Sequence, residues 1–333
     1  MIKLIACDLD GTLLNSSMEI SDANVQAIKR AQENGIEFMV ASGRAPHESQ
    51  PMLKEYGIDC GFINLNGGLV FDTAGNLIVK NPLKLETAKK ICRLLKKEGF
   101  YFELVTSNHV YSEDLSQRIT NVAHLMVELN PMLTFKEAVL VSASKPAIVS
   151  IKQVPSYEDL MDEPGTEVMK ILVFDSRGQY AFTDVIKKIE EIDKLSITSS
   201  AADNIEINAA GAQKGRSLLD YAAAKGIKRE EIAAIGDNLN DESMIQAAGT
   251  GVAMAWPWRV MAMCVARARK SGCGADRACM MASAQCVQGC WARAARCGCS
   301  GSAAICFWAV AVKSSISAYS PSLAITPFST APP

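Results

Sequence analysis

The stretch IKLIACDLDGT, residues 2–12, decides the fold and contains the first candidate catalytic groups. Its apolar residues 2–7 predict a buried β-strand, and Gly11 allows a sharp turn just beyond it. Asp8 and Asp10 are two residues apart, so on an extended chain their side chains point the same way. Two close carboxylates are costly unless a cation or a shared proton relieves their repulsion. The alternative is an ordinary turn in which an aspartate caps a helix, and this segment alone favours neither interpretation.

An alternation of short apolar runs and amphipathic stretches continues beyond this strand. Val25, Ile28 and Ala31 lie on one face of a predicted helix that ends at a glycine. Further strands are predicted at 36–41, 61–65, 232–236 and 251–254, and further helices at 215–226 and 241–249. The alternation predicts an α/β fold, a Rossmann-like, doubly wound parallel sheet with helices on both faces. A ligand is then expected beyond the carboxyl ends of the strands.

The rhythm changes in the middle of the chain. A helix is predicted at 86–99 and another near 183–194, among short strands and a looser stretch near 140–166. This pattern predicts an α+β module inserted into the first domain. We therefore expect a core formed by residues 1–82 and 207–254, an inserted cap at 83–206, and a separate tail at 255–333.

Three further segments place polar groups at predicted strand ends or helix starts. In ASGR, Ser42 offers a hydroxyl and Gly43 an unobstructed N–H, both suited to phosphate oxygens. Lys214 precedes a predicted helix N-terminus, where anions are favoured. GDNLND follows a predicted strand and supplies oxygen ligands of the kind that Mg²⁺ prefers, from Asp237, Asn240 and Asp241. Each segment taken alone is also typical of an ordinary loop or a solvated lysine.

Taken together and in this order, the four segments resemble the motifs of the haloacid dehalogenase superfamily of phosphotransferases. The inserted module resembles the large α/β cap (type IIB) of its Cof-like sugar-phosphatase branch, and the likeness covers residues 1–254. The segment LNGG, with Asn66 and Gly67, is similar to a family segment that faces the substrate. The resemblance implies a Mg²⁺-dependent phosphomonoester hydrolase acting on a sugar phosphate or a similar small phosphorylated metabolite.

The resemblance also implies a role for each matching residue. Asp8 is the nucleophile that becomes an aspartyl-phosphate, and Asp10 protonates the leaving alcohol and then activates water. The phosphoryl oxygens are held by the N–H of Leu9 and by Ser42, Gly43, Lys214 and Asn240. The Mg²⁺ ligands are Asp8, the Asp10 carbonyl, Asp237 and Asp241. Physical chemistry supports this arrangement, because an aspartate approaches an anionic phosphate ester only where cations such as Mg²⁺ and Lys214 neutralise both.

Two other functions remain open at this point. A phosphomutase of the same superfamily would return the phosphoryl group from Asp8 to the substrate. A non-catalytic phosphate-binding or regulatory module would keep the acidic site without turnover. Asp10 favours an enzyme, because a module without turnover does not need a second carboxylate two residues after the nucleophile.

Charge, hydropathy and cysteine content indicate which partners and which cellular compartment to expect. The net charge of −2 gives no indication of a nucleic-acid partner, and the longest late apolar run, ten residues from Ala303, is too short to span a bilayer. Residues 1–254 contain only three cysteines, which is typical of a reduced, cytoplasmic protein. Oligomeric state is left open.

The tail from Ala255 differs sharply from what precedes it. It holds eight of the 11 cysteines, all four tryptophans and one acid, for a net charge of +7 against −9 for residues 1–254. Our favoured hypothesis is a shifted reading frame near codon 255, because the change falls within a predicted strand and without a linker. A genuine interaction extension and a zinc module are the alternatives; the zinc module has poor ligand spacing at Cys286, Cys290, Cys297 and Cys299.

Other polar and thiol residues are assigned less specific roles. Arg44 is either a substrate ligand or a surface residue. Three histidines, His47, His109 and His124, lack metal-site spacing and are interpreted as structural. Cys7 lies in a predicted buried strand and is interpreted as a packing residue.

Overall fold

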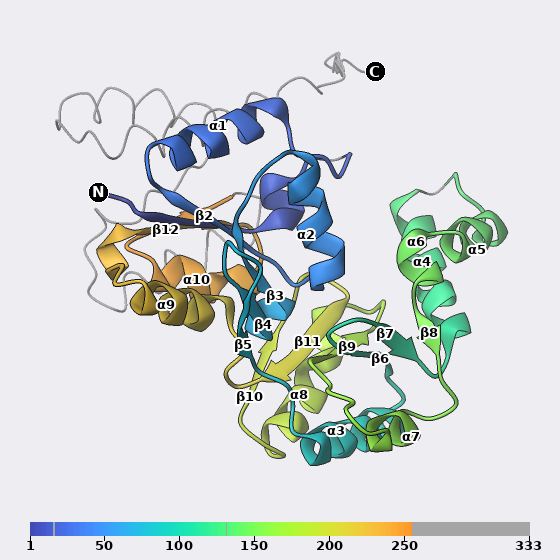
Figure 1. Ribbon diagram of the computed structural model, residues 1–333. Helices are drawn as coiled ribbons and strands as arrows, with labels where there is room; N and C mark the ends of the chain where they lie inside the picture. Colours follow the sequence, from blue (N-terminus) through green and yellow to red (C-terminus); the bar gives the residue numbers. More distant parts are fainter. Residues whose placement is uncertain (16, 131, 255–333) are drawn as a thin grey trace, which may run out of the picture.

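The core of the fold is a seven-stranded sheet with β1 in its interior (Figure 1). The computed structural model describes residues 1–254 apart from residues 16 and 131, so the three hypotheses about the tail concern residues outside the described range. In spatial order the strands are β13 (Thr250–Ala253), β12 (Ile232–Gly236), β1 (Leu4–Cys7), β2 (Glu37–Ala41), β3 (Gly61–Asn64), β4 (Leu69–Phe71) and β5 (Leu77–Lys80). The first five are mutually parallel, and β4 and β5 extend the sheet with antiparallel pairing.

Helices cover both faces of this sheet, because its buried strands are apolar on both sides. Cys7 and Phe38 belong to the cluster under α1 (Asp22–Glu33) and α2 (Pro46–Glu55). Leu4 and Met39 belong to the opposite cluster under α9 (Lys214–Ala224) and α10 (Glu242–Ala247). Figure 1 shows these two helix pairs on opposite sides of the sheet. The predicted doubly wound α/β core is confirmed.

The cap contains a second sheet of six strands. In spatial order they are β10 (Leu195–Thr198), β11 (Asn204–Ala209), β9 (Lys170–Phe174), β6 (Tyr101–Val105), β7 (Val110–Ser112) and β8 (Lys152–Gln153). One face is apolar and packs on α3 (Leu85–Lys97), α7 (Tyr157–Asp162) and α8 (Thr183–Glu190). The other face bears buried charged side chains, Glu103, Lys170 and Glu206, and lies toward the core (Figure 1).

Three further helices pack together beyond the β8 edge of the cap sheet (Figure 1). They are α4 (Leu115–Leu129), α5 (Phe135–Ala143) and α6 (Pro146–Val149). Sequence reasoning missed them and α7. The helices α4 to α6 pack mainly on one another and lack a clear apolar stripe toward a sheet, whereas α7 packs on the cap sheet but has only six residues. The residues that cap their N-termini are the sequence features that indicate two of these helices. Asp114 caps α4, and Thr134 with Glu137 forms a capping box at α5.

Two short connections join core and cap, at 81–84 and 210–213. Asn81 holds them side by side, because its Nδ2 donates to the Gly67 carbonyl at 3.1 Å and to the Gly211 carbonyl at 3.4 Å. The domain boundary that we place after residue 206 from the sequence lies within β11, which runs from Asn204 to Ala209.

Candidate functional site

Three carboxylates meet at the carboxyl ends of two neighbouring core strands. Asp8 follows β1, and Asp237 and Asp241 follow β12, which pairs in parallel with β1. The Asp8 amide donates to the Ile235 carbonyl at 2.9 Å, which fixes the register at the point where both strands end. Asp8, Asp237 and Asp241 each offer a carboxylate oxygen, and these oxygens lie within 4.8 Å of one another. Parallel pairing therefore brings together residues that are far apart in sequence.

Lys214 is the cation within this acidic cluster. It begins α9 and is fully buried, and its Nζ donates at 2.6 Å to Asp8 Oδ1 and at 2.6 Å to Asp241 Oδ1. Three ionised carboxylates and one ammonium leave two negative charges without compensation. Because uncompensated buried charge is costly, the donor set suits a divalent cation with oxygen ligands.

The raised pKa values of two of these carboxyl groups also favour a bound cation. Burial raises the pKa of Asp8 well above its ordinary value, although Lys214 opposes the shift. Burial also raises the pKa of Asp237 to about 6, against a hydrogen bond from Thr12 that lowers it. Burial alone would lower the pKa of Lys214, but Asp241 and Asp8 outweigh it and the pKa is raised. The cluster therefore holds protons readily unless a cation replaces them.

The turn after β1 brings the backbone close to Asp237. Gly11 has a φ of 79°, and a Cβ at this position would lie 2.4 Å from Asp237 Oδ2. Only glycine fits both the left-handed conformation and this close approach. The next residue, Thr12, donates its hydroxyl to Asp237 Oδ1 at 2.8 Å. Leu9, within the same turn, is fully buried.

Asp10 lies apart from the three clustered carboxylates and is paired with Arg44. The Arg44 Nε donates to Asp10 Oδ2 at 2.8 Å, and an Arg44 terminal nitrogen lies 2.6 Å from Oδ1. The side chain of Asp10 is 48% exposed and that of Arg44 23% exposed. Hydrogen bonding to Asp10, the largest influence, raises the pKa of Arg44. The sequence left open whether Arg44 is a substrate ligand or a surface residue. Its contact with Asp10 favours a substrate ligand.

Three of the predicted phosphate-binding side chains, Ser42, Asn66 and Asn240, lie beside Gly43. Ser42 is buried and its Oγ accepts from the Arg44 amide at 3.1 Å. A Cβ on Gly43 would lie 3.2 Å from Asn66 Oδ1 and 3.7 Å from Asn240 Nδ2. The Oδ1 of Asn240 is buried and has no hydrogen-bond partner among the described residues.

Gly67, which the sequence also assigned to the phosphate-binding groups, lies away from Gly43. It packs against α9, where a Cβ would lie 2.4 Å from Ser217 Oγ, and it is not among the residues that line the cavities described next.

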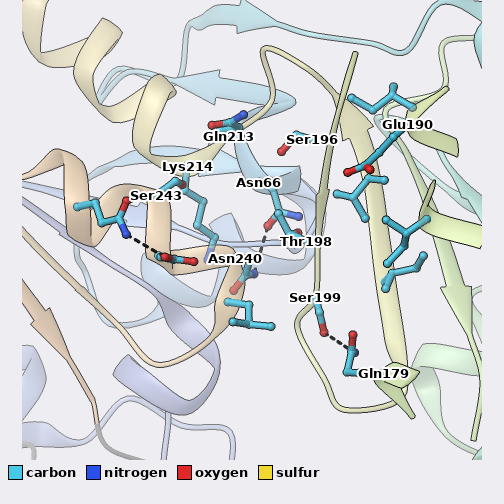
Figure 2. Close-up of a pocket in the computed structure, with 17 residues that line it drawn as sticks. Asn66, Gln179, Glu190, Ser196, Thr198, Ser199, Gln213, Lys214, Asn240 and Ser243 are labelled. Carbon is cyan, nitrogen blue, oxygen red and sulfur yellow. Dashed lines mark hydrogen bonds between the residues drawn. The ribbon is translucent and has the colours of Figure 1, made fainter. Parts of the chain in front are cut away.

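A cavity of about 250 Å³ lies between core and cap over this site. Asp8, Asp10 and Arg44 line it from the core. The cap supplies Glu103, Arg118, Lys170 and Glu206, together with other residues. A larger cavity of about 500 Å³ lies beside it, and Asn240 lines both. Figure 2 shows Lys214, Asn66 and Asn240 on one side of the larger cavity, facing Ser196, Thr198 and Ser199 of the cap.

Sequence reasoning did not identify these charged cap residues. The signal was present in the strand NIEIN, where Glu206 stands between Ile205 and Ile207. Alternate residues of a strand face opposite sides of the sheet, so a charge between two buried isoleucines marks the face turned away from the apolar helices. Lys170, at the start of an apolar strand, follows the same logic.

The described thiols are buried, and two of the histidines contact aromatic rings. Cys7, Cys60 and Cys92 are buried free thiols, and burial raises the pKa of Cys7 well above its ordinary value. Among the residues that the structure covers, the one group of metal-binding type is the Asp8 cluster, which contains no histidine. His109 and His124 lie against the rings of Tyr111 and Phe135.

We predict that the metal-free protein loses stability as the pH rises from about 4 to about 6, because a raised carboxyl pKa stabilises the folded protonated form. For Asp237, with a folded pKa of about 6, this contribution is complete below the unfolded value of about 3.9 and is lost as the pH rises through the folded value. Thermal unfolding in EDTA across this range measures it. Asp237→Asn should flatten the dependence; an equal slope in both proteins would contradict the assignment.

Comparison with known proteins identifies the family. Residues 5–256 match the family described as haloacid dehalogenase-like hydrolase. The chain belongs to this family. The haloacid dehalogenase resemblance drawn from the four motifs is thereby confirmed.

Curated relatives of this chain include phosphatases that the alignment covers over most of their length. Phosphatase YwpJ of Bacillus subtilis is 35% identical over 259 residues, which cover 76% of this chain and 89% of that protein. The 5-amino-6-(5-phospho-D-ribitylamino)uracil phosphatase YwtE of the same organism is 34% identical over 254 residues, 76% of this chain and 87% of that protein. This chain is accordingly a phosphatase of the haloacid dehalogenase superfamily.

A solved structure of a haloacid dehalogenase-like hydrolase from B. subtilis resembles the fold described above. It superposes with a TM-score of 0.64 and 31% sequence identity, over 76% of this chain and 89% of that chain. Among the described residues, no helix is long and apolar enough to span a membrane.

Proposed function

We propose that this phosphatase is a Mg²⁺-dependent phosphomonoester hydrolase that acts through an aspartyl-phosphate on Asp8. The observation that carries the proposal is the cluster of the buried Asp8 and Asp241 with the half-buried Asp237, which Lys214 compensates only in part. Such a site gains most from binding a divalent cation and an anionic ester together, because each relieves the repulsion that the other meets.

In this proposal Asp8 attacks phosphorus and the bond to the leaving oxygen breaks. Lys214 lies 2.6 Å from Asp8 Oδ1, so it neutralises the nucleophile and is close enough to contact a transferring phosphoryl group. Ser42, the amides at Leu9 and Gly43, and the side-chain amide of Asn240 supply the remaining donors. Donors fixed before the reaction stabilise the developing charge without reorganisation.

The residues present fit Mg²⁺. Asp8, Asp237 and Asp241 would hold it, with the Asp10 carbonyl as a further ligand and Asp241 acting through water. When bound, the ion would neutralise phosphoryl oxygens and the charge of the nucleophile. Thr12 and the Asp237 and Asn238 amides, which donate to the Asp237 and Asp241 carboxylates, keep these groups oriented toward the ion.

Asp10 is the proposed acid and base. Its carboxyl group would give a proton to the leaving alcohol and later take one from the water that hydrolyses the aspartyl-phosphate. Arg44 now contacts both Asp10 oxygens. Proton exchange therefore requires the guanidinium to turn away from at least one of them, and a bound ester is positioned to compete for it.

The proposed substrate is a sugar phosphate or a similarly small phosphorylated metabolite in the cytoplasm. The cavity over Asp8 is about 250 Å³, which lies near the lower end of the ~300–1,000 Å³ typical of small-molecule pockets. Its charged cap wall suits a leaving group rich in hydroxyls. YwtE is named for a phosphorylated ribityl compound, which belongs to this broad class. We infer neither a nucleic-acid nor a membrane partner.

The test is an assay of the purified chain with p-nitrophenyl phosphate. Nitrophenol and inorganic phosphate should be released in equal amounts with Mg²⁺, and release should stop with EDTA. Folded protein that is inert on a broad panel of phosphate esters would favour a binding module. Transfer within a sugar bisphosphate without net phosphate release would favour a mutase.

We also predict that Mg²⁺ raises the thermal stability of the folded chain. At a hundredfold excess over its Kd, a ligand that binds only the folded state adds ~2.7 kcal/mol. For a chain of this size that corresponds to a rise in Tm of roughly 5–10 °C. Scanning fluorimetry with MgCl₂ and with NaCl of equal ionic strength measures it. Equal shifts in both salts would mean that the cluster binds no Mg²⁺.

A further inference from the structure

A hydrogen-bond relay crosses from the cap to the proposed phosphate site. The Asn66 Nδ2 donates to Glu206 Oε2 at 2.5 Å, and the Asn240 Nδ2 donates to Asn66 Oδ1 at 3.3 Å. Glu206 lies on β11 of the cap, whereas Asn66 and Asn240 lie in loops of the core. All three side chains are at least nine-tenths buried, and Figure 2 shows the contact between Asn66 and Asn240.

The direction of this relay is set at its cap end. An ionised carboxylate only accepts hydrogen bonds, so Asn66 must turn its NH₂ group toward Glu206. Its carbonyl oxygen is then left facing Asn240, which must turn its own NH₂ group toward Asn66. One N–H of Asn240 remains free to donate. Glu206 thus decides which end of the Asn240 amide is a donor.

Glu206 is held in the ionised form by its surroundings. Burial alone would raise its pKa, but Lys170, Asn66 and Ser200 outweigh burial and the pKa is lowered. The Lys170 Nζ lies 2.9 Å from Glu206 Oε1 and also donates to the Gly43 carbonyl at 3.1 Å. Lys170 thus joins the same carboxylate to the loop that contains Ser42 and Gly43.

The backbone at Asn66 is strained in a way that fits a fixed orientation. Asn66 has a φ of 57°, and Leu65 before it has a φ of 50°. Side chains other than glycine rarely adopt this region, although asparagine tolerates it better than most. This turn places the Asn66 side chain at the interface between cap and core, where it contacts Glu206.

We propose that Glu206 and Asn66 are positioning residues, which set the orientation of the Asn240 amide so that it donates to the phosphoryl group. The proposal rests on the phosphatase function proposed above, because it assigns Asn240 to the phosphoryl group. The contact between cap and core and phosphate recognition are then coupled, since the group that orients Asn240 belongs to the cap.

Glu206→Gln is the sharpest test, because it is close to isosteric. The Lys170 ammonium group can only donate hydrogen bonds, so the new amide should turn its oxygen to Lys170 and its NH₂ to Asn66. Asn66 and Asn240 would then both reverse, and Asn240 would present an acceptor to the anion. We expect kcat/KM to fall about 10- to 100-fold, the range typical of lost outer-shell partners. The fall should be equal for p-nitrophenyl phosphate and for sugar phosphates, and inhibition by inorganic phosphate should weaken in parallel.

A merely structural or leaving-group role predicts different results. If Glu206 binds the leaving group, the two kinds of ester will be affected unequally and phosphate inhibition will not change. Glu113→Gln is the matched control, since Glu113 is a cap carboxylate that bonds to Lys96 and to the Tyr157 amide, away from the cavity. It should keep wild-type kinetics. Wild-type kcat/KM in a folded Glu206→Gln protein overturns the inference, whereas an inert wild type overturns the proposed function.

Asn66→Asp provides a second test that does not depend on Glu206→Gln. Two carboxylates would face each other beside Lys170 and Ser200, and the hydrogen bond from residue 66 to Glu206 would persist only where the new carboxyl group carries a proton that it donates. The ratio of variant to wild-type kcat/KM should therefore rise as the pH falls from 8 to 5.5. A ratio that does not change with pH contradicts a contribution of the bond between residue 66 and Glu206 to catalysis.

Discussion

Asp8→Asn should abolish phosphate release, with kcat reduced by roughly 10⁴-fold or more, because an amide cannot form the covalent phosphoryl intermediate. Asparagine has almost the same shape as aspartate, and it removes one of the three clustered carboxylates. The variant should therefore fold, and in EDTA it should be more stable than the wild type. Steady-state hydrolysis of p-nitrophenyl phosphate and thermal unfolding in EDTA measure the two effects.

Two further variants make this result decisive. Asp8→Ala excludes residual activity that arises from deamidation of the asparagine. Asp220→Asn removes an exposed carboxylate of α9 that lies 3.7 Å from Arg216, and it should keep wild-type activity. Substantial turnover in both Asp8 variants would mean that another group attacks phosphorus.

Lys214→Met should lower kcat/KM by about 10³-fold, at the upper end of the cost of removing one charge-stabilising donor. Lys214 donates to Asp8 and Asp241 at 2.6 Å each and is fully buried. Its removal leaves both carboxylates without their shared partner, which costs ~3–5 kcal/mol in buried pairs. In EDTA the variant should therefore unfold at a clearly lower temperature, and Mg²⁺ should recover part of the loss.

The matched control for Lys214→Met lies at the other end of α9. Lys225 pairs with Glu37 at 2.7 Å and contacts the Tyr221 ring, on the exposed side of the helix. Lys225→Met should change stability slightly and leave kcat/KM unchanged. If a folded, Mg²⁺-loaded Lys214→Met protein keeps a tenth of wild-type activity, Lys214 does not hold the transferring group.

The core of the site could be predicted because local sequence determines where strands end. Asp8 and Asp237 each follow an apolar run, and the topological rule for parallel sheets then places them together. The cap contacts could not be predicted in this way. Whether Glu206 meets Asn66 depends on how two folded units dock, and no periodicity within either segment carries that information. The bidentate pair of Asp10 and Arg44 is also a tertiary contact, although both residues follow neighbouring strands.

The helices α4 to α6 show a second limit of prediction from sequence. Their apolar side chains serve small local contacts, so the periodic signal is weak and only the end caps indicate helices. The sheet strands, by contrast, are buried on both faces, and their continuous apolar runs are hard to misinterpret.

The pairing of β1 with β12 has a consequence for the order of folding during synthesis. Leu4 lies beside Ile232, whereas every cap strand has been synthesised by Ala209. Because domains fold as units while the chain emerges from the N-terminus, we expect the inserted cap to form while the surrounding core sheet still lacks β12, the strand that pairs with β1. The nascent chain would thus hold Asp8 in water until β12 and α9 emerge. The charges that perform the chemistry would be the last to be brought together.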